Sequence, residues 1–124
     1  MKIQSYKDLI VWQKSIQLVK DVYILTAAFP QSEIYGITSQ MRRAAVSIPS
    51  NIAEGYGRRS TKDYLRFYLI AYGSALELET QLIISKELGF ATNKNLTVTN
   101  TLLIEVMKML NSMISKMKGL ITSA

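Results

Sequence analysis

The chain has 124 residues, of which 48% are hydrophobic and 19% are charged. This length and composition fit one globular domain, residues 1–124, and exclude a disordered chain. The chain has no Cys and no His, which excludes a disulfide scaffold, thiolate metal sites and a histidine general base. We therefore expect no metal, no cofactor and no catalytic residues, and we expect that the protein is not an enzyme.

Charge and hydropathy also bear on location and partners. Residues 1–8 lack the apolar segment of a signal peptide, and no uncharged stretch approaches the roughly 18 apolar residues that cross a bilayer. We therefore expect a cytoplasmic protein without a membrane partner. The net charge of +6 favours polyanionic or acidic partners.

The first predicted helix runs from about Lys7 to Ala28. Ser5 and Asp8 resemble a capping box at its start, and Pro30 ends it because proline disfavours helical geometry in the preceding residue. Apolar side chains recur at three- and four-residue spacing along two neighbouring stripes. The stripes are Leu9, Trp12, Ile16, Val19, Tyr23 and Thr26, and Val11, Leu18, Val22, Leu25 and Phe29.

The second predicted helix runs from about Ser32 to Tyr56 and contains Pro49 near its middle. Proline removes the hydrogen bond to the Ala45 carbonyl and crowds it, which predicts a kink within one continuous helix. Polar neighbours are expected to satisfy backbone groups there: Ser47, Ser50 and Asn51. The apolar stripe continues on both sides of the proline through Ile34, Ile37, Met41, Ala44, Ile48 and Ile52.

The third predicted helix runs from about Thr61 to Leu88. Ser60 and Asp63 resemble a capping box before it, and Gly89 is a typical residue after a helix end. It again carries two stripes, Tyr64, Phe67, Ala71, Ser74, Leu78, Leu82 and Ser85, and Leu65, Leu69, Tyr72, Leu76 and Ile83.

The fourth predicted helix starts between Asn93 and Val98 and ends near Gly119 to Ile121. Its start is hard to place because Thr and Asn are poor helix formers but good caps. Its stripes are Leu103, Met107, Leu110, Ile114, Met117 and Ile121, and Leu102, Val106, Met109, Met113 and Leu120. The four methionines of this helix are consistent with core filling or with an adaptable binding groove.

Four long helices with short connections predict an all-α protein, an antiparallel up-and-down four-helix bundle with its second helix kinked at Pro49. One stripe per helix suffices to face a bundle core. The doubled stripes therefore predict exposed apolar surface and self-association. The alternative is one wide core-facing stripe whose edges are covered by long polar side chains.

The middle of the chain resembles a known family. The resemblance rests on QMRRAAVSIPSNIAEG at residues 40–55, on YLRF at 64–67 and GSALELE at 73–79, and upstream on DLIVWQK at 8–14. These segments resemble the 23S rRNA intervening-sequence protein family, also called the four-helix bundle protein family, over about residues 8–90. The resemblance implies a homo-oligomeric ring, typically a pentamer, and no defined activity. It also implies a distant relation to the accessory proteins of diversity-generating retroelements, which are thought to bind nucleic acid.

Basic residues concentrate between positions 42 and 66, which carry a net charge of +4. Arginine-rich surface with tyrosines nearby (Tyr56, Tyr64 and Tyr68) fits phosphate contact and base stacking by RNA or DNA. The alternative is a solvated turn whose arginines pair with acids of the third helix. The candidate nucleic-acid-binding residues lie at or just after the turn between the second and third helices: Arg58, Arg59, Lys62 and Arg66.

Two further features are expected to be structural. Antiparallel pairing of the second and third helices brings Arg42 or Arg43 within reach of Glu77 or Glu79, which predicts a partly buried ion pair. The two glutamates are two residues apart and point to different helix faces, which disfavours a catalytic carboxylate pair. The same register places the small residues Ala44 and Ala45 opposite residues 73–75, where they allow close packing. The alternative is a niche for a small molecule.

The sequence leaves three functional hypotheses. The leading one is a non-enzymatic, homo-oligomeric scaffold or nucleic-acid accessory protein. The second is a protein–protein interaction module without a nucleic-acid role. The third, an enzyme that uses carboxylates alone, has no motif to support it.

Overall fold

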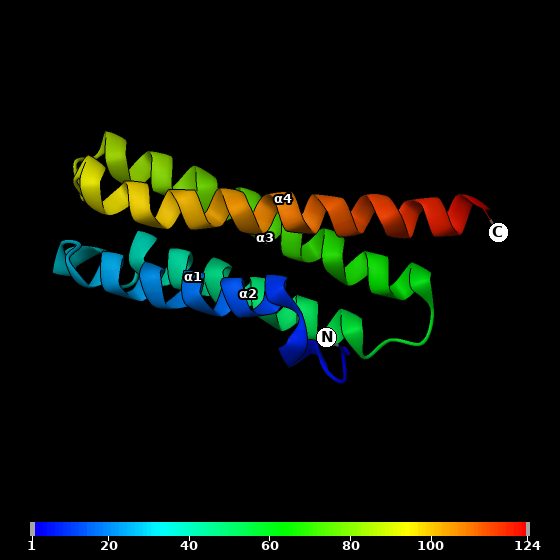
Figure 1. Cartoon of the computed structure of the whole chain (residues 1–124). Helices are drawn as coiled ribbons and strands as arrows, with labels where there is room; N and C mark the ends of the chain where they lie inside the picture. Colours follow the sequence, from blue (N-terminus) through cyan, green and yellow to red (C-terminus); the bar gives the residue numbers. More distant parts are fainter. Residues whose placement is uncertain (1, 124) are drawn as a thin grey trace.

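The computed structural model describes residues 2–123, and its framework is four α-helices (Figure 1). No strand occurs within the described residues, so the all-α prediction is confirmed. The helices are α1 (Ile10–Ala27), α2 (Ile37–Tyr56), α3 (Thr61–Glu87) and α4 (Asn93–Ser123). Two short 3-10 helices, η1 (Tyr6–Asp8) and η2 (Gln31–Glu33), precede α1 and α2.

The four helices pack as a bundle in which each touches two neighbours. Helix α1 packs against α2 and α4, and α3 packs against the same two, whereas the described residues of diagonal helices make no contact. Contacts between α2 and α3 run in opposite sequence order, since Met41 meets Ser85 and Ser47 meets Ser74. The C-terminal part of α4 continues past the start of α1 (Figure 1), so this end of the bundle is covered on fewer sides.

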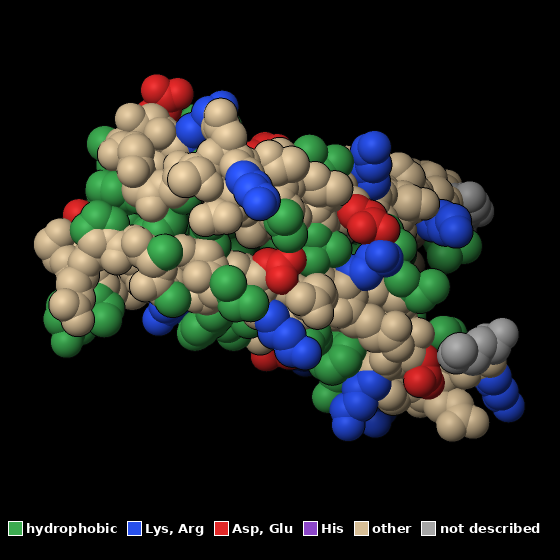
Figure 2. All heavy atoms as spheres, turned by 60° about the vertical axis from the view of Figure 1, so that its left-hand side comes forward, with side chains coloured by type: hydrophobic (Ala, Val, Ile, Leu, Met, Phe, Trp, Pro, Cys, Tyr) green, Lys and Arg blue, Asp and Glu red, His purple; other side chains and the backbone are tan. Residues whose placement is uncertain are grey.

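On α1 and α3 one stripe of each doubled pair forms the core, whereas on α4 both stripes contribute, since Leu103 and Val106 are both fully buried. On α1 the stripe that contains Leu18 and Val22 is buried. On α3 the buried stripe contains Ala71, Leu78 and Leu82. The second stripe of α3 reaches the surface, with exposed fractions of 44% for Leu69, 44% for Leu76 and 58% for Ile83. The apolar surface that the doubled stripes predict is therefore present, and Figure 2 shows hydrophobic side chains between scattered charges on the face it presents.

The helix starts are later than the sequence predicts for α1 and α2. The capping box of Ser5 and Asp8 forms, but it caps η1, and the extended conformation of Leu9 separates η1 from α1. Likewise residues 31–33 form η2, and α2 begins only after Gly36, whose backbone is not helical. Helix α3 ends at Glu87, followed by Gly89 in the left-handed region with φ of 72°.

Pro49 lies inside α2, so the prediction of one continuous helix is confirmed. The bend at this position stays a prediction. Ser50 Oγ donates to the Val46 carbonyl at 2.9 Å, and Asn51 Nδ2 donates to the Ser47 carbonyl at 2.8 Å. The proline removes the hydrogen bond that the Ala45 carbonyl would otherwise accept. The two side chains bond to the next carbonyls along α2, those of Val46 and Ser47.

Small residues bring α2 and α3 together. Ala44, Ala45 and Ala75 of these two packed helices are all fully buried. Gly73, which the sequence placed in the same contact, is exposed, and a Cβ atom there would meet nothing within 4 Å. Gly55 is the tighter position, since its Cβ would lie 3.0 Å from Phe67 Cβ. None of the described helices is both long and apolar enough to cross a bilayer.

Candidate nucleic-acid interface

The turn between α2 and α3 is short, and hydrogen bonds within it fix its conformation. The Arg58 N–H donates to the Gly55 carbonyl at 3.1 Å, which continues the chain smoothly out of α2. Ser60 is extended, and its hydroxyl accepts a hydrogen bond from the Asp63 N–H at 3.1 Å, which starts α3. This geometry leaves all the predicted cationic side chains of the turn exposed: Arg58, Arg59, Lys62 and Arg66.

Two of these cations share one aromatic ring. The guanidinium carbon of Arg58 lies 4.5 Å from the centroid of the Phe67 ring, and that of Arg66 lies 4.8 Å from it. Phe67 is only 8% exposed, so the ring is a fixed support for both guanidiniums. The turn thus holds two positive charges at one aromatic ring, an arrangement that favours an anion beside them.

Few acids neutralise this cluster. Glu54 lies 3.8 Å from Arg58, and both side chains are largely exposed, so their pairing is weak. Within residues 2–123, Arg59, Lys62 and Arg66 make no ion pair. Their charges are therefore available to a phosphate backbone.

The tyrosines near the turn differ in their access to solvent. Tyr64 stacks on Tyr68 with a centroid distance of 4.9 Å, and Tyr56 packs against Tyr64 at 6.5 Å. Tyr68 is fully buried, so the expectation that it stacks on a base is wrong. Burial, together with the hydrogen bond to the Tyr64 hydroxyl, raises the pKa of the Tyr68 hydroxyl far above its ordinary value. Only Tyr56 and Tyr64, both half-buried, can reach a ligand.

The predicted arginine–glutamate contact involves Arg43 and Glu77, whose Nη2 and Oε2 atoms are 3.5 Å apart. Their side chains are 67% and 43% exposed, so the expectation of a partly buried pair is wrong. Arg42 instead donates to Thr26 Oγ1 at 2.9 Å and lies over the ring of Tyr23. Glu79 makes no ion pair with any other described residue.

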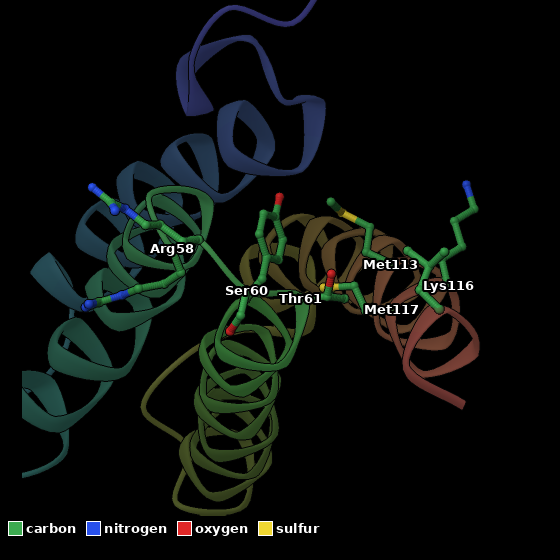
Figure 3. Close-up of a pocket in the computed structure, with 9 residues that line it drawn as sticks. Arg58, Ser60, Thr61, Met113, Lys116 and Met117 are labelled. Carbon is green, nitrogen blue, oxygen red and sulfur yellow. The ribbon is translucent and has the colours of Figure 1, made fainter. Parts of the chain in front are cut away.

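The described residues contain no group of three or more acidic side chains placed to hold a metal ion. They do contain a pocket beside the basic turn, with a volume of about 420 Å³, which sequence reasoning missed. Figure 3 shows Thr61 beside Met117 of α4, whereas the Ser60 side chain points away from the methionines. The methionines of α4 were the only signal for this pocket, because its two walls come from segments about fifty residues apart. The pocket is lined by Arg58, Arg59, Ser60, Thr61, Tyr64, Met113, Lys116, Met117 and Leu120.

Comparison with known proteins bears on the family and the fold. No curated protein matches the chain. A solved structure with the same fold is that of a protein of unknown function from the S23 ribosomal protein family of Bacteroides thetaiotaomicron. It has a TM-score of 0.77 and 24% sequence identity, and the match covers 85% of this chain and 98% of that one.

The family model matches most of the chain. It is described as 23S rRNA-intervening sequence protein and covers residues 7–112. The match includes the segments that carry the resemblance and extends beyond residue 90 into α4, where the sequence offered no recognisable motif. The chain therefore belongs to the 23S rRNA-intervening sequence protein family.

Proposed function

We propose that this protein is a non-enzymatic, homo-oligomeric accessory protein that binds the backbone of RNA or DNA through the turn between α2 and α3. The observation that carries the proposal is the exposed cationic cluster of this turn, with two guanidiniums held on the Phe67 ring. Lys62 and Arg66 are four residues apart in α3 and share a helix face. Contacts from these groups go to phosphates, so the binding is largely independent of sequence.

Self-association strengthens a weak contact of this kind. The exposed stripe of Leu69, Leu76 and Ile83 supplies apolar surface for association between copies of the chain. In a ring, such as the pentamer that the family resemblance implies, every copy presents its turn on the same rim. A long polyanion then contacts several turns at once, which multiplies the affinity through avidity.

The test is the affinity for single-stranded and structured RNA across a salt series. The variant Arg58→Ala/Arg59→Ala/Lys62→Ala/Arg66→Ala is expected to lose affinity and to show a shallower dependence on salt, because it releases fewer counterions on binding. The matched control, Lys20→Ala/Lys86→Ala/Lys94→Ala/Lys108→Ala, removes the same number of exposed positive charges elsewhere on the molecule. It is expected to bind nearly as well as the wild type.

The possible outcomes distinguish nucleic-acid binding at the turn from the alternative function, a protein–protein interaction module. Equal losses in both variants would indicate attraction to net charge without a defined site. Absence of binding by the wild-type oligomer at low salt would leave the second function, a protein–protein interaction module, as the better account of the exposed apolar stripe. Both variants are checked for unchanged oligomer mass, so that a loss of avidity is not mistaken for a loss of contacts.

A further inference from the structure

The pocket between the basic turn and α4 combines an apolar wall with a cationic rim. Met113 and Met117 form the α4 side, and Tyr64 contributes an aromatic ring from α3. Arg58 and Lys116 also line the pocket, one from each side. None of the described residues that line it is acidic, so a suitable ligand has flat apolar faces and adjacent negative charge.

We propose that this pocket receives one unstacked base of a single-stranded nucleic acid, while the neighbouring phosphates lie on the cations of the rim. This inference rests on the proposed function, since the phosphate contacts bring the strand to the turn. Every base has a π-face, so capture by Tyr64 and the two methionines tolerates any sequence. The volume of about 420 Å³ is in the range of small-ligand sites.

The directions of the side chains fit a division of roles in which the pocket holds the base and the cations of the rim hold the phosphates. In Figure 3 the Arg58 side chain extends away from Met113 and Met117, so its head group meets the strand outside the pocket. Thr61 lies between Ser60 and the methionines, where its hydroxyl can bond to the edge of a base. The Ser60 side chain points away from the methionines in Figure 3, which leaves Thr61 as the hydroxyl group on the pocket side of the turn.

An acidic amphipathic peptide is the competing occupant. The peptide also pairs apolar and negatively charged groups, but it places few charges on a rim that carries three cations, Arg58, Arg59 and Lys116. Lys62 and Arg66 add two exposed cations outside the pocket lining, and Arg66 shares the Phe67 ring with Arg58. A continuous polyanion matches this run of charges better than a short acidic segment does.

The test compares an oligodeoxyadenylate with an abasic oligomer of the same length and charge, by fluorescence polarisation at fixed salt. The wild type is expected to bind the base-bearing strand about tenfold more tightly, as follows from stacking energies of about 1–3 kcal/mol per base. Tyr64→Leu and Met113→Ala change opposite walls of the pocket. Each is expected to reduce the preference for the base-bearing strand while leaving the affinity for the abasic oligomer unchanged.

The control is Tyr35→Leu, which removes a tyrosine that is 94% exposed and lies before α2, at the other end of the bundle. It is expected to keep the full preference. Equal wild-type affinity for the two oligomers would overturn base capture and leave backbone binding intact, whereas no binding of either would overturn both. Displacement of the strand by a helical peptide of Glu and Leu, with Leu at three- and four-residue spacing, and no preference between the two oligomers would identify the pocket as a peptide site. The use of two variants from different helices guards against the misfolding of one.

Discussion

Tyr68 is an ionisable residue that the fold keeps neutral. Its hydroxyl is fully buried and bonds to that of Tyr64 at 3.4 Å, and burial raises its pKa far above the usual value of about 10. Above about pH 10, the usual pKa of tyrosine, the unfolded chain releases the hydroxyl proton of Tyr68 and the folded chain keeps it. Folding stability therefore falls with rising pH, by up to about 1.4 kcal/mol per pH unit from this group.

The Tyr68→Phe variant tests this coupling. Below pH 10 it is expected to change the free energy of unfolding by only about 1 kcal/mol, because the hydrogen bond it removes is long. Above pH 10 its stability is expected to fall less steeply than that of the wild type. The measurement is denaturant unfolding from pH 8 to 11, and parallel curves for the two proteins would contradict the prediction.

The contact of Arg43 with Glu77 is expected to contribute little to stability. Both side chains are more than a third exposed and the N–O distance is 3.5 Å, so solvent screens the attraction. A double-mutant cycle with Arg43→Met and Glu77→Gln should give a coupling energy of about 0–1 kcal/mol. A coupling of several kcal/mol would show that the pair is buried in the oligomer.

At the scale of helices, alanine substitutions at Gly55 and Gly73 are expected to change the stability of the protein in opposite directions. A Cβ at Gly55 meets Phe67 Cβ at 3.0 Å and both Tyr64 O and Tyr68 Cδ1 at 3.3 Å. Gly55→Ala is therefore expected to force α2 and α3 apart and to destabilise the protein by about 1–3 kcal/mol. Gly73→Ala meets nothing in an exposed part of α3 and should stabilise it by about 0.5–1 kcal/mol. Thermal unfolding of the two variants measures the difference, and equal shifts would contradict the assigned packing.

The sequence predicted the helices because their apolar spacing and caps are local signals. Ser60 and Gly89 mark the two ends of α3 in the sequence, and both act there in the structure. Local signals could not decide which of two equally spaced stripes faces the core, since that depends on how neighbouring helices rotate. They also could not show that Tyr68 is buried or that Met113 lies near Thr61, because both facts arise from contacts between helices.

At the scale of the whole molecule, the exposed stripe of α3 is the main unexplained feature of a single copy. Leu69, Leu76 and Ile83 recur every seven residues along one helix, which is the spacing of a continuous helical seam. We expect sedimentation at micromolar concentration to show a species several times the 14.0 kDa mass of one chain. A monomer at this concentration would refute self-association.

The variant Leu76→Glu/Ile83→Lys tests whether this stripe forms the interface. It keeps the net charge and places charged groups on the seam, where association would bury them at a high cost in desolvation. The mass in sedimentation is therefore expected to fall while the helical circular dichroism persists. The control Ile24→Glu/Val98→Lys makes the same change at exposed apolar residues of α1 and α4, and it should leave the mass unchanged. The reverse result, with the mass lost only in the control, would assign the interface to the α1–α4 face.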